Sequence, residues 1–223
     1  MTPRGPQLEQ IARFLLGPDI AVAHCPVGQG SSGLFPDEAA AISRAIPARR
    51  DEFAAGRHAA RTAMVALGRA AVSIPMAPDR APEWPAGLTG SITHADGLAL
   101  AAIAPLTHVR AIGLDLEKDA PLDGDLWQAI LLDQERAWLE TLPEPRRAQY
   151  AMRIFSAKEA VYKAQYPVTG AFLEFTDITI SYGENDDAFS AEFMVNARPF
   201  TKGTSHKGRQ TLAAGMILSL LRI

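Results

Sequence analysis

Apolar positions along this chain follow two different periods, and each change of period predicts a change of element. Residues 37–68 repeat their apolar positions every three to four residues. This spacing predicts two helices separated at Pro47, the second starting near Ala48 and stopping at Gly68. A proline-rich connection around Trp84 follows.

The next stretch has a period of two. Apolar side chains alternate with polar or small ones in residues 90–94 and in most of 110–117, while residues 98–104 between them are entirely apolar. The pair Asp96-Gly97, between the first two of these segments, is a strong hairpin signal. We therefore expect the three segments to form an antiparallel meander.

The remaining half repeats this order. Residues 126–141 and 146–165 have helical periodicity, and the second helix is expected to end before Pro167 because the residue before a proline avoids helical backbone angles. The strands expected after it lie at about 173–182, 188–195 and 211–221, with polar turns at 183–187 and 201–209.

The order helix, sheet thus occurs twice. It predicts an α+β fold of two halves, residues 1–109 and 110–223, each a small antiparallel sheet packed with helices. We expect one compact molecule with the strand at residues 110–117 at the seam.

Composition limits the function classes. A chain of 223 residues that is 48% hydrophobic and 21% charged can bury a substantial core. Its net charge of −3 argues against a nucleic-acid binder. The lone Cys25 excludes an internal disulfide framework, and the apolar runs 98–106 and 216–221 are too short to span a bilayer. With no apolar signal-peptide core in residues 1–10, we expect a cytoplasmic protein without a membrane span.

Two acidic stretches are the first indication of chemistry. In residues 112–117, apolar side chains alternate with polar ones, so a strand sends Asp115 and Glu117 to one face. Two neighbouring carboxylates repel each other unless a cation lies between them, and Mg²⁺ favours carboxylate and phosphate oxygens. Further along the chain, Glu159 and Lys163 could add a third carboxylate and a phosphate-binding ammonium group.

Glu159 also has an ordinary explanation. Ser156 and Glu159 have the spacing of a capping box at a helix start, and Glu159 and Lys163 have the spacing of a helical ion pair. Only when read together with Asp115 and Glu117 does the segment resemble a metal and phosphate site.

Three arginines form a second candidate group. On the helix predicted after Pro47, Arg50, Arg57 and Arg61 fall within a stripe about 40° wide. Guanidinium groups bind phosphate oxygens well, so the stripe could cradle a phosphate. The alternative is a solvated helix face with Glu52 nearby.

The strand at residues 90–94 offers neutral donors. Ser91 and Thr93 share one face and precede His94, so the segment could bind an anion. A nucleophilic Ser91 and His94 pair is disfavoured because their side chains point to opposite faces, while a purely structural histidine remains open.

These segments, in this order, resemble the 4′-phosphopantetheinyl transferases, specifically the larger, pseudo-dimeric (Sfp-like) group and, within it, the enterobactin synthase component D type. The blocks that carry the resemblance span about half of the chain: Arg49-Arg50-Asp51-Glu52-Phe53, Gly56-Arg57-His58-Ala59-Ala60-Arg61, Trp84-Pro85-Ala86-Gly87-Leu88, Gly90-Ser91-Ile92-Thr93-His94, Gly113-Leu114-Asp115-Leu116-Glu117 and Phe155-Ser156-Ala157-Lys158-Glu159-Ala160-Val161-Tyr162-Lys163. The resemblance implies a monomer whose two halves are related by pseudo-twofold symmetry.

The resemblance also implies a reaction. The phosphopantetheine arm of coenzyme A would pass to a serine of an apo acyl or peptidyl carrier protein, in siderophore, polyketide or nonribosomal peptide biosynthesis, with release of adenosine 3′,5′-bisphosphate. Asp115, Glu117 and Glu159 would hold Mg²⁺, and the catalytic residues would be Glu159, Lys163 and Asp115, with Glu159 as general base. Coenzyme A would be bound by Arg50, Arg57, Arg61, Arg80, Ser91, Thr93, His94, Lys158 and Lys163.

The sequence leaves two alternative functions open. Another metal-dependent phosphoryl or nucleotidyl transferase could use the same carboxylates and arginines, and a non-catalytic coenzyme A-binding module would need no metal. No glycine-rich phosphate loop and no dinucleotide-binding fingerprint is present, which disfavours ordinary ATPases and dehydrogenases.

Overall fold

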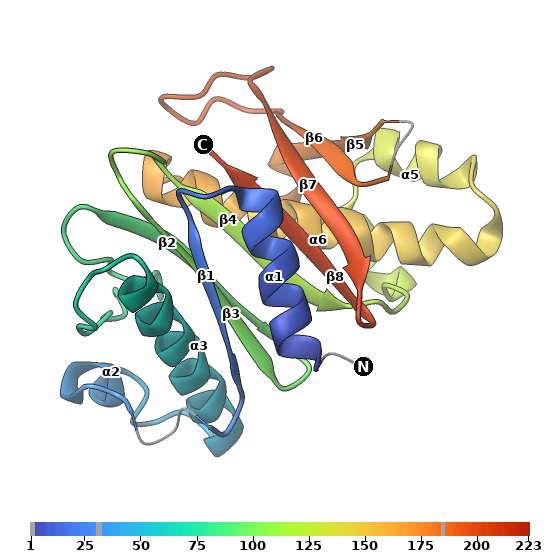
Figure 1. Ribbon diagram of the computed structural model, residues 1–223. Helices are drawn as coiled ribbons and strands as arrows, with labels where there is room; N and C mark the ends of the chain where they lie inside the picture. Colours follow the sequence, from blue (N-terminus) through green and yellow to red (C-terminus); the bar gives the residue numbers. More distant parts are fainter. Residues whose placement is uncertain (1–2, 30–32, 184–185) are drawn as a thin grey trace. The chain divides into compact units, whose positions relative to one another are not determined.

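Two antiparallel sheets, one of three strands and one of five, organise the chain (Figure 1). The computed structural model describes residues 3–29, 33–183 and 186–223. The chain divides into two compact units, Met1–Ile112 and Gly113–Ile223. Each unit contains one sheet and its helices, and the predicted α+β class is confirmed.

The first unit has strand order β1-β3-β2. Helix α3 packs on β1 and β3 through small residues, with Ala55, Ala59 and Ala63 against Ala99 and Ala101. Such small side chains let the helix lie close to the sheet. The elements of this unit are α1 (Arg4–Leu16), β1 (Ala21–Pro26), α2 (Pro36–Ala41), α3 (Pro47–Ala66), β2 (Leu88–Ala95) and β3 (Leu98–Pro105).

The predicted hairpin between β2 and β3 is confirmed. Asp96 and Gly97 have φ angles of 49° and 77°, as a two-residue turn with two left-handed positions requires. Helix α1 and strand β1 were not predicted from the sequence.

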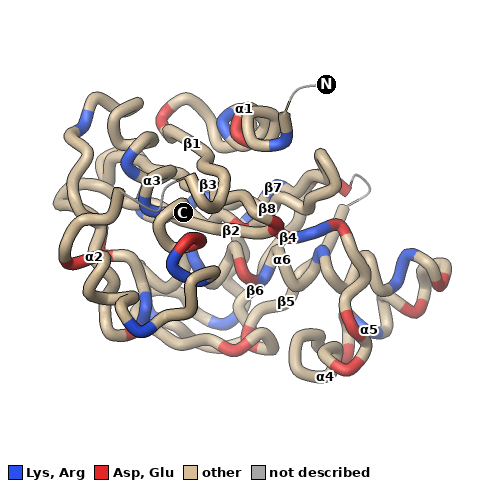
Figure 2. Tube along the Cα trace, turned by 90° about the horizontal axis from the view of Figure 1, so that it is seen from below, with Lys and Arg blue, Asp and Glu red and all other residues tan. Residues whose placement is uncertain are grey.

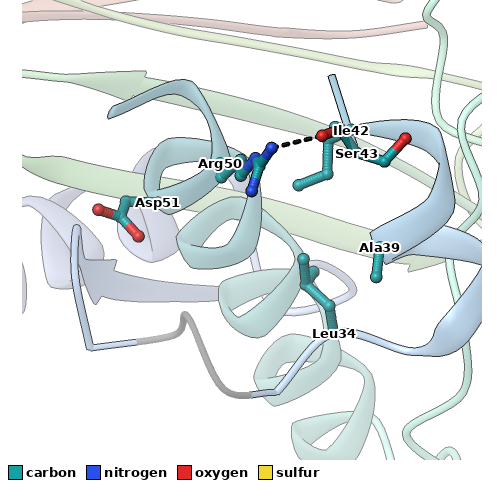
Figure 3. A pocket seen from close by; sticks show the side chains of 6 residues that line it. All are labelled: Leu34, Ala39, Ile42, Ser43, Arg50 and Asp51. Carbon is teal, nitrogen blue, oxygen red and sulfur yellow. Dashed lines mark hydrogen bonds between the residues drawn. The ribbon is translucent and has the colours of Figure 1, made fainter. Parts of the chain in front are cut away.

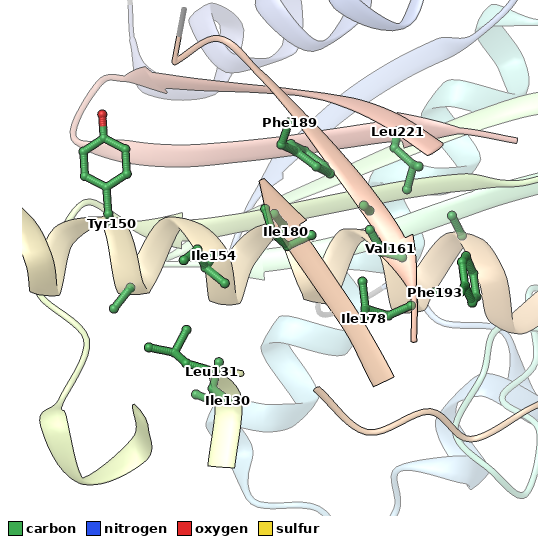
Figure 4. Close-up of a cluster of buried hydrophobic side chains, with 14 of the residues drawn as sticks. Ile130, Leu131, Tyr150, Ile154, Val161, Ile178, Ile180, Phe189, Phe193 and Leu221 are labelled. Carbon is green, nitrogen blue, oxygen red and sulfur yellow. The ribbon is translucent and has the colours of Figure 1, made fainter. Parts of the chain in front are cut away.

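The second unit has strand order β4-β8-β7-β6-β5, and α6 packs on β8 (Figure 1). Its core lies between α6 and the strands, as Ile154 and Val161 of α6 meet Ile180, Phe189 and Phe193 (Figure 4). Its first strand, β4, begins at Ile112, the last residue of the first unit. The elements of this unit are β4 (Ile112–Lys118), η1 (Gly124–Leu126), α4 (Trp127–Ile130), α5 (Asp133–Glu140), α6 (Glu144–Thr169), η2 (Phe175–Asp177), β5 (Ile178–Tyr182), β6 (Ala188–Phe193), β7 (Ser205–Ala213) and β8 (Met216–Arg222).

The predicted meander was wrong in its third strand. Residues 112–118 do not pair with β3, because β1 and β2 already occupy both edges of β3. They form β4, the edge strand of the five-stranded sheet, next to β8. This difference places the acidic strand in the same sheet as the last strands of the chain.

Two helix predictions were also wrong in detail. The predicted helix at residues 126–141 is broken into α4 and α5. Helix α6 continues through Pro167 to Thr169, where the left-handed Gly170 ends it by donating its backbone N–H to Tyr166 O at 2.8 Å. A proline near the end of a long, packed helix removes only one of many backbone hydrogen bonds, so the helix continues past it.

The single strand predicted at residues 211–221 is a hairpin. Strands β7 and β8 pair through a turn at Ala214 and Gly215, which both have positive φ angles. Most of the predicted polar turn at 201–209 belongs to β7, which begins at Ser205. Its polar side chains alternate with inward-facing ones, as expected for a strand with one exposed face.

No helix in the described part of the chain is long and apolar enough to cross a membrane. Acidic and basic residues are interspersed along the trace (Figure 2), in agreement with the small net charge of −3.

Candidate active site

Asp115 is the most constrained of the predicted acidic residues. Its side chain is nearly inaccessible, at 2% exposure, and its two oxygens have different partners. Oδ2 accepts a hydrogen bond from Ser156 Oγ at 2.9 Å, and Oδ1 meets Lys163 Nζ at 2.6 Å. The predicted link between the acidic strand and the later lysine is therefore present, since α6 supplies both donors.

Close packing of β4 on α6 makes these contacts possible. A Cβ atom added to Gly113 would lie 1.9 Å from Ala160 O, a backbone atom of α6. Because strand side chains alternate, Asp115 and Glu117 share the face on which Gly113 meets the helix. The absence of a side chain at Gly113 thus brings both carboxylates close to Glu159 and Lys163.

The carboxylates disturb one another electrostatically. Burial, together with the charges of Asp115 and Glu159, raises the pKa of Glu117 to about 7, although Lys163 opposes this shift. Burial and Asp115 also raise the pKa of Glu159, again against Lys163. Hence one lysine offsets only part of the negative charge that these groups gather.

This charge bears on the predicted Mg²⁺ site. In the described ranges, no group of three or more His, Cys, Asp or Glu side chains is placed to hold a metal ion by itself. The oxygen donors and the unbalanced negative charge nevertheless fit a hard cation that takes several of its ligands from substrate phosphates and water, as Mg²⁺ does. The side chains could thus supply part of a coordination shell.

A pH dependence follows for the metal-free protein. Between pH 4.5 and about 7, folded Glu117 is protonated while unfolded Glu117 is ionised, so its contribution to stability falls as pH rises. We expect Glu117→Gln to raise the melting temperature relative to the unsubstituted protein increasingly from pH 4.5 to 7, measured by calorimetry with chelator present. A difference that stays constant across this range would contradict the raised pKa.

The capping-box interpretation of Ser156 and Glu159 was wrong. Ser156 lies in the middle of α6, so no helix begins there. Its hydroxyl is fully buried and bonds Asp115 and Ser219 Oγ instead of a backbone N–H. Glu159 is thus not required as a cap and contributes its charge to the cluster with Asp115 and Glu117.

Lys158 belongs to the core and not to the ligand site predicted for it. Its side chain is nearly inaccessible, and Nζ lies 2.7 Å from Glu135 Oε2, 2.7 Å from Ile130 O and 2.9 Å from Phe175 O. An ammonium group has three hydrogens, and these three acceptors use all of them. The helical period explains the difference, because Lys158 lies about 100° around α6 from Glu159.

We expect Lys158→Met to be destabilising without affecting ligand binding. It leaves the buried Glu135 carboxylate without its cation, which costs about 3–5 kcal/mol of unfolding free energy in comparable cases. Urea unfolding would measure this loss. An unchanged unfolding midpoint together with weaker coenzyme binding would instead favour the original assignment of Lys158.

In the first unit, Arg57 and Arg61 lie on α3 but are buried, at 5% and 7% exposure. Arg57 Nε donates to Ile74 O at 2.7 Å, and burial lowers the pKa of Arg57 to about 10, which keeps it charged at neutral pH. Arg61 Nη1 meets both carboxylate oxygens of the fully buried Glu38 at 2.9 Å. Their guanidinium groups therefore brace α3 against neighbouring segments.

Arg50, the third arginine of the predicted stripe, is exposed near a pocket of about 310 Å³ (Figure 3). Its guanidinium donates to Ala45 O and Ser43 O and so holds the link between α2 and α3. The pocket is lined by Leu34, Ala39, Ile42, Ser43, Arg50 and Asp51.

The face predicted for Ser91 and Thr93 is buried. Both lie on the opposite side of β2 from Ile92, which packs against α3. His94 shares the α3 side and meets Arg49 of that helix, with Nη1 and Nε2 2.6 Å apart. The structure therefore separates the two hydroxyl groups from the histidine.

Arg49 was not among the predicted site residues. It lies about 80° around α3 from Arg57, outside the predicted stripe, and its contact with His94 joins residues 45 positions apart. Since arginine can only donate, His94 Nε2 is the acceptor and the ring proton lies on Nδ1. A sequence pattern contains no signal for such a long-range contact.

Arg80 lies on an exposed turn. Its φ angle is 73°, and its backbone N–H bonds Ala77 O at 2.8 Å. Its predicted role as a phosphate contact stays a prediction.

Comparison with known proteins follows the same division of the chain. Residues 37–104 match the family "4'-phosphopantetheinyl transferase N-terminal domain", and residues 111–213 match the "4'-phosphopantetheinyl transferase superfamily". The second match contains β4 and α6, which carry Asp115, Glu159 and Lys163.

Individual relatives of the chain support the same family. The chain is 36% identical over 196 residues to 4'-phosphopantetheinyl transferase Svp of Streptomyces mobaraensis, covering 85% of this chain and 78% of that protein. It is 35% identical over 196 residues to 4'-phosphopantetheinyl transferase Npt of Nocardia iowensis, covering 83% and 87%. Enterobactin synthase component D of Salmonella typhi is 39% identical over only 120 residues, covering 52% of this chain and 48% of that protein. The match to the component D type is thus confined to about half of the chain, whereas the matches to Svp and Npt cover more than four fifths of it.

Proposed function

Because this chain belongs to the 4′-phosphopantetheinyl transferase superfamily and transfers 4′-phosphopantetheine to carrier proteins, we propose that β4 and α6 supply its catalytic groups. The observation that carries this assignment is the contact of Asp115 Oδ1 with Lys163 Nζ at 2.6 Å, beside Glu117 and Glu159, whose pKa values are raised. Asp115, Glu117 and Glu159 would hold Mg²⁺ against the diphosphate of coenzyme A.

The chemistry follows from these groups. The serine oxygen of the carrier protein attacks the phosphorus that bears the pantetheine arm, and a new P–O bond forms as the bridging P–O bond breaks. Adenosine 3′,5′-bisphosphate leaves with the electron pair of the broken bond. Bound Mg²⁺ would supply Lewis acidity that offsets the charge on the bridging oxygen.

Glu159 takes the proton of the serine. Burial and the Asp115 charge raise its pKa, which makes it a better base than an ordinary carboxylate. Lys163, one turn further along α6, donates to Asp115 before substrate arrives and can turn to an oxygen of the leaving bisphosphate. Both residues stay half-buried, so substrate phosphates can reach them.

Mass spectrometry tests the reaction directly. Incubation with coenzyme A, Mg²⁺ and apo carrier proteins is expected to add one phosphopantetheine to the carrier and nothing to a carrier whose acceptor serine is alanine. Coenzyme A that remains intact with a broad set of acyl and peptidyl carriers would argue against the proposal.

We further propose that Arg49 and His94 bind a phosphate of coenzyme A. Both are more accessible than Arg57 and Arg61, and they already lie 2.6 Å apart. Arg49→Gln is expected to raise the KM for coenzyme A about tenfold or more, as loss of one charged hydrogen bond costs roughly 1.5–3 kcal/mol. The matched control is Arg69→Gln, at an exposed arginine beyond the end of α3. Equal KM values in the two variants would exclude this role.

A further inference from the structure

A chain of buried polar side chains runs through the second unit and ends on Asp115. Ser156, Gln210 and Ser219 are fully buried, and Arg153 is 4% exposed. Ser219 is the one polar residue in the apolar run 216–221 of β8. Burying such groups is costly unless each is hydrogen-bonded, so their contacts call for a physical explanation.

The contacts are continuous. Arg153 Nε donates to Gln210 Oε1 at 2.7 Å, and Gln210 Nε2 donates to Ser219 Oγ at 2.8 Å. Ser219 Oγ lies 2.8 Å from Ser156 Oγ, which donates to Asp115 Oδ2 at 2.9 Å. Four elements contribute, because Arg153 and Ser156 lie on α6, Gln210 and Ser219 are paired across β7 and β8, and Asp115 is on β4.

The direction of every hydrogen bond in the series from Arg153 to Asp115 follows from donor and acceptor chemistry. A guanidinium can only donate, so the amide oxygen of Gln210 faces Arg153 Nε and its NH₂ faces Ser219. The same NH₂ group donates to the backbone oxygen of Arg153 at 2.8 Å, which excludes the flipped amide. Because Ser156 gives its one hydrogen to Asp115, the hydrogen between the two serines comes from Ser219.

All donors therefore point the same way, from the Arg153 cation to the Asp115 anion. Each hydroxyl that accepts a hydrogen bond becomes a better donor to the next group, so such a chain strengthens its final bond. The cation itself is held firmly, since it lies 4.6 Å above the Tyr150 ring and 5.1 Å from the Tyr182 ring. Tyr182 also donates to Gln210 Oε1, at 3.0 Å.

We propose that Ser156, Ser219 and Gln210 are positioning residues that fix Asp115 Oδ2 and thereby hold Oδ1 toward Lys163, where it would also be available to a metal ion. The proposal rests on the function proposed above, and it adds Gln210 and Ser219, which touch no reacting group. Partners in the outer shell of metal ligands commonly change metal affinity by about 10- to 100-fold when they are removed.

The test measures metal affinity in the absence of any carrier protein. Binding of Mn²⁺ in the presence of coenzyme A, followed by electron paramagnetic resonance, is expected to weaken about tenfold in Ser219→Ala and more strongly in Ser156→Ala. The control is Ser190→Ala, which removes the same atom from an exposed serine pair with Ser205 in the same sheet. Thermal melts of each variant show that the folded protein is being compared.

The outcomes separate the two proposals. Suppose that Mn²⁺ affinity is lost in Asp115→Asn and Ser156→Ala but is normal in Ser219→Ala. This result would overturn the positioning role of the hydrogen-bond series and leave the metal site in place. Normal affinity in Asp115→Asn would remove the metal site and the positioning role together, while transfer to carrier proteins would still be judged by mass spectrometry. Equal weakening in Ser219→Ala and Ser190→Ala would also overturn the positioning role.

Discussion

Replacement of Asp115 by asparagine is expected to lower kcat/KM for transfer about a thousandfold while the protein stays folded. The amide keeps the shape of the carboxylate but has one acceptor oxygen for the two donors, Ser156 Oγ and Lys163 Nζ. The substitution also removes the negative charge that would hold the metal ion. A bound metal ion contributes several kcal/mol to transition-state stabilisation. Initial rates at saturating and limiting Mg²⁺, with calorimetry to verify folding, measure the effect.

Asp119→Asn is the matched control for this experiment. Asp119 is an exposed carboxylate just beyond the end of β4 and accepts from Gln149 Nε2 at 2.9 Å. The substitution should leave the transfer rate within about a factor of two of the rate of the unsubstituted protein, as expected for a surface substitution. Full activity of Asp115→Asn at limiting Mg²⁺ would show that β4 does not carry the metal site.

Gly113→Ala is expected to have the second largest effect, on both stability and activity. The added Cβ would lie 1.9 Å from Ala160 O, and a backbone oxygen in the middle of α6 cannot turn away as a side chain can. Strand and helix must separate, which we expect to cost about 3 kcal/mol or more of unfolding free energy. Asp115 and Glu117 would move away from Glu159 at the same time, so transfer should fall even in the folded fraction.

Gly124→Ala makes the same chemical change where there is room. A Cβ atom on Gly124 would have no neighbouring atom within 4 Å, so its unfolding midpoint and transfer rate should stay close to those of the unsubstituted protein. Chemical unfolding of both variants, followed by rates measured well below each midpoint, separates the loss of stability from the loss of activity. Similar stability of the two variants would mean that β4 and α6 do not need their close contact.

Much of the site could be predicted because it depends on local periodicity. Alternation along residues 112–117 was enough to place Asp115 and Glu117 on one face of a strand. The order of the sequence blocks then indicated which later helix would bring Glu159 and Lys163, and the contact between Lys163 and Asp115 agrees with that prediction.

The predictions about the site were wrong where one local sequence pattern is compatible with two structural environments. The sequence from Ser156 to Glu159 is equally compatible with a helix start and a helix interior, and only the full extent of α6, Glu144–Thr169, decides between them. Lys158 is next to Glu159, the proposed general base, in sequence, yet its side chain enters the core to pair with Glu135. In each case the partner is distant along the chain.

By itself the sequence determined the α+β class, the two carboxylates on one strand face and the enzyme family, because side-chain alternation and the order of short segments can be read along the chain without knowing which segments pack together. The tertiary structure alone decided that the acidic strand pairs with β8 and that Gly113 lets it approach α6. It also revealed that a line of buried donors from Arg153 ends on Asp115. These features depend on which distant segments pack together, and packing selects partners by shape and hydrogen bonding across the whole unit rather than by position along the chain.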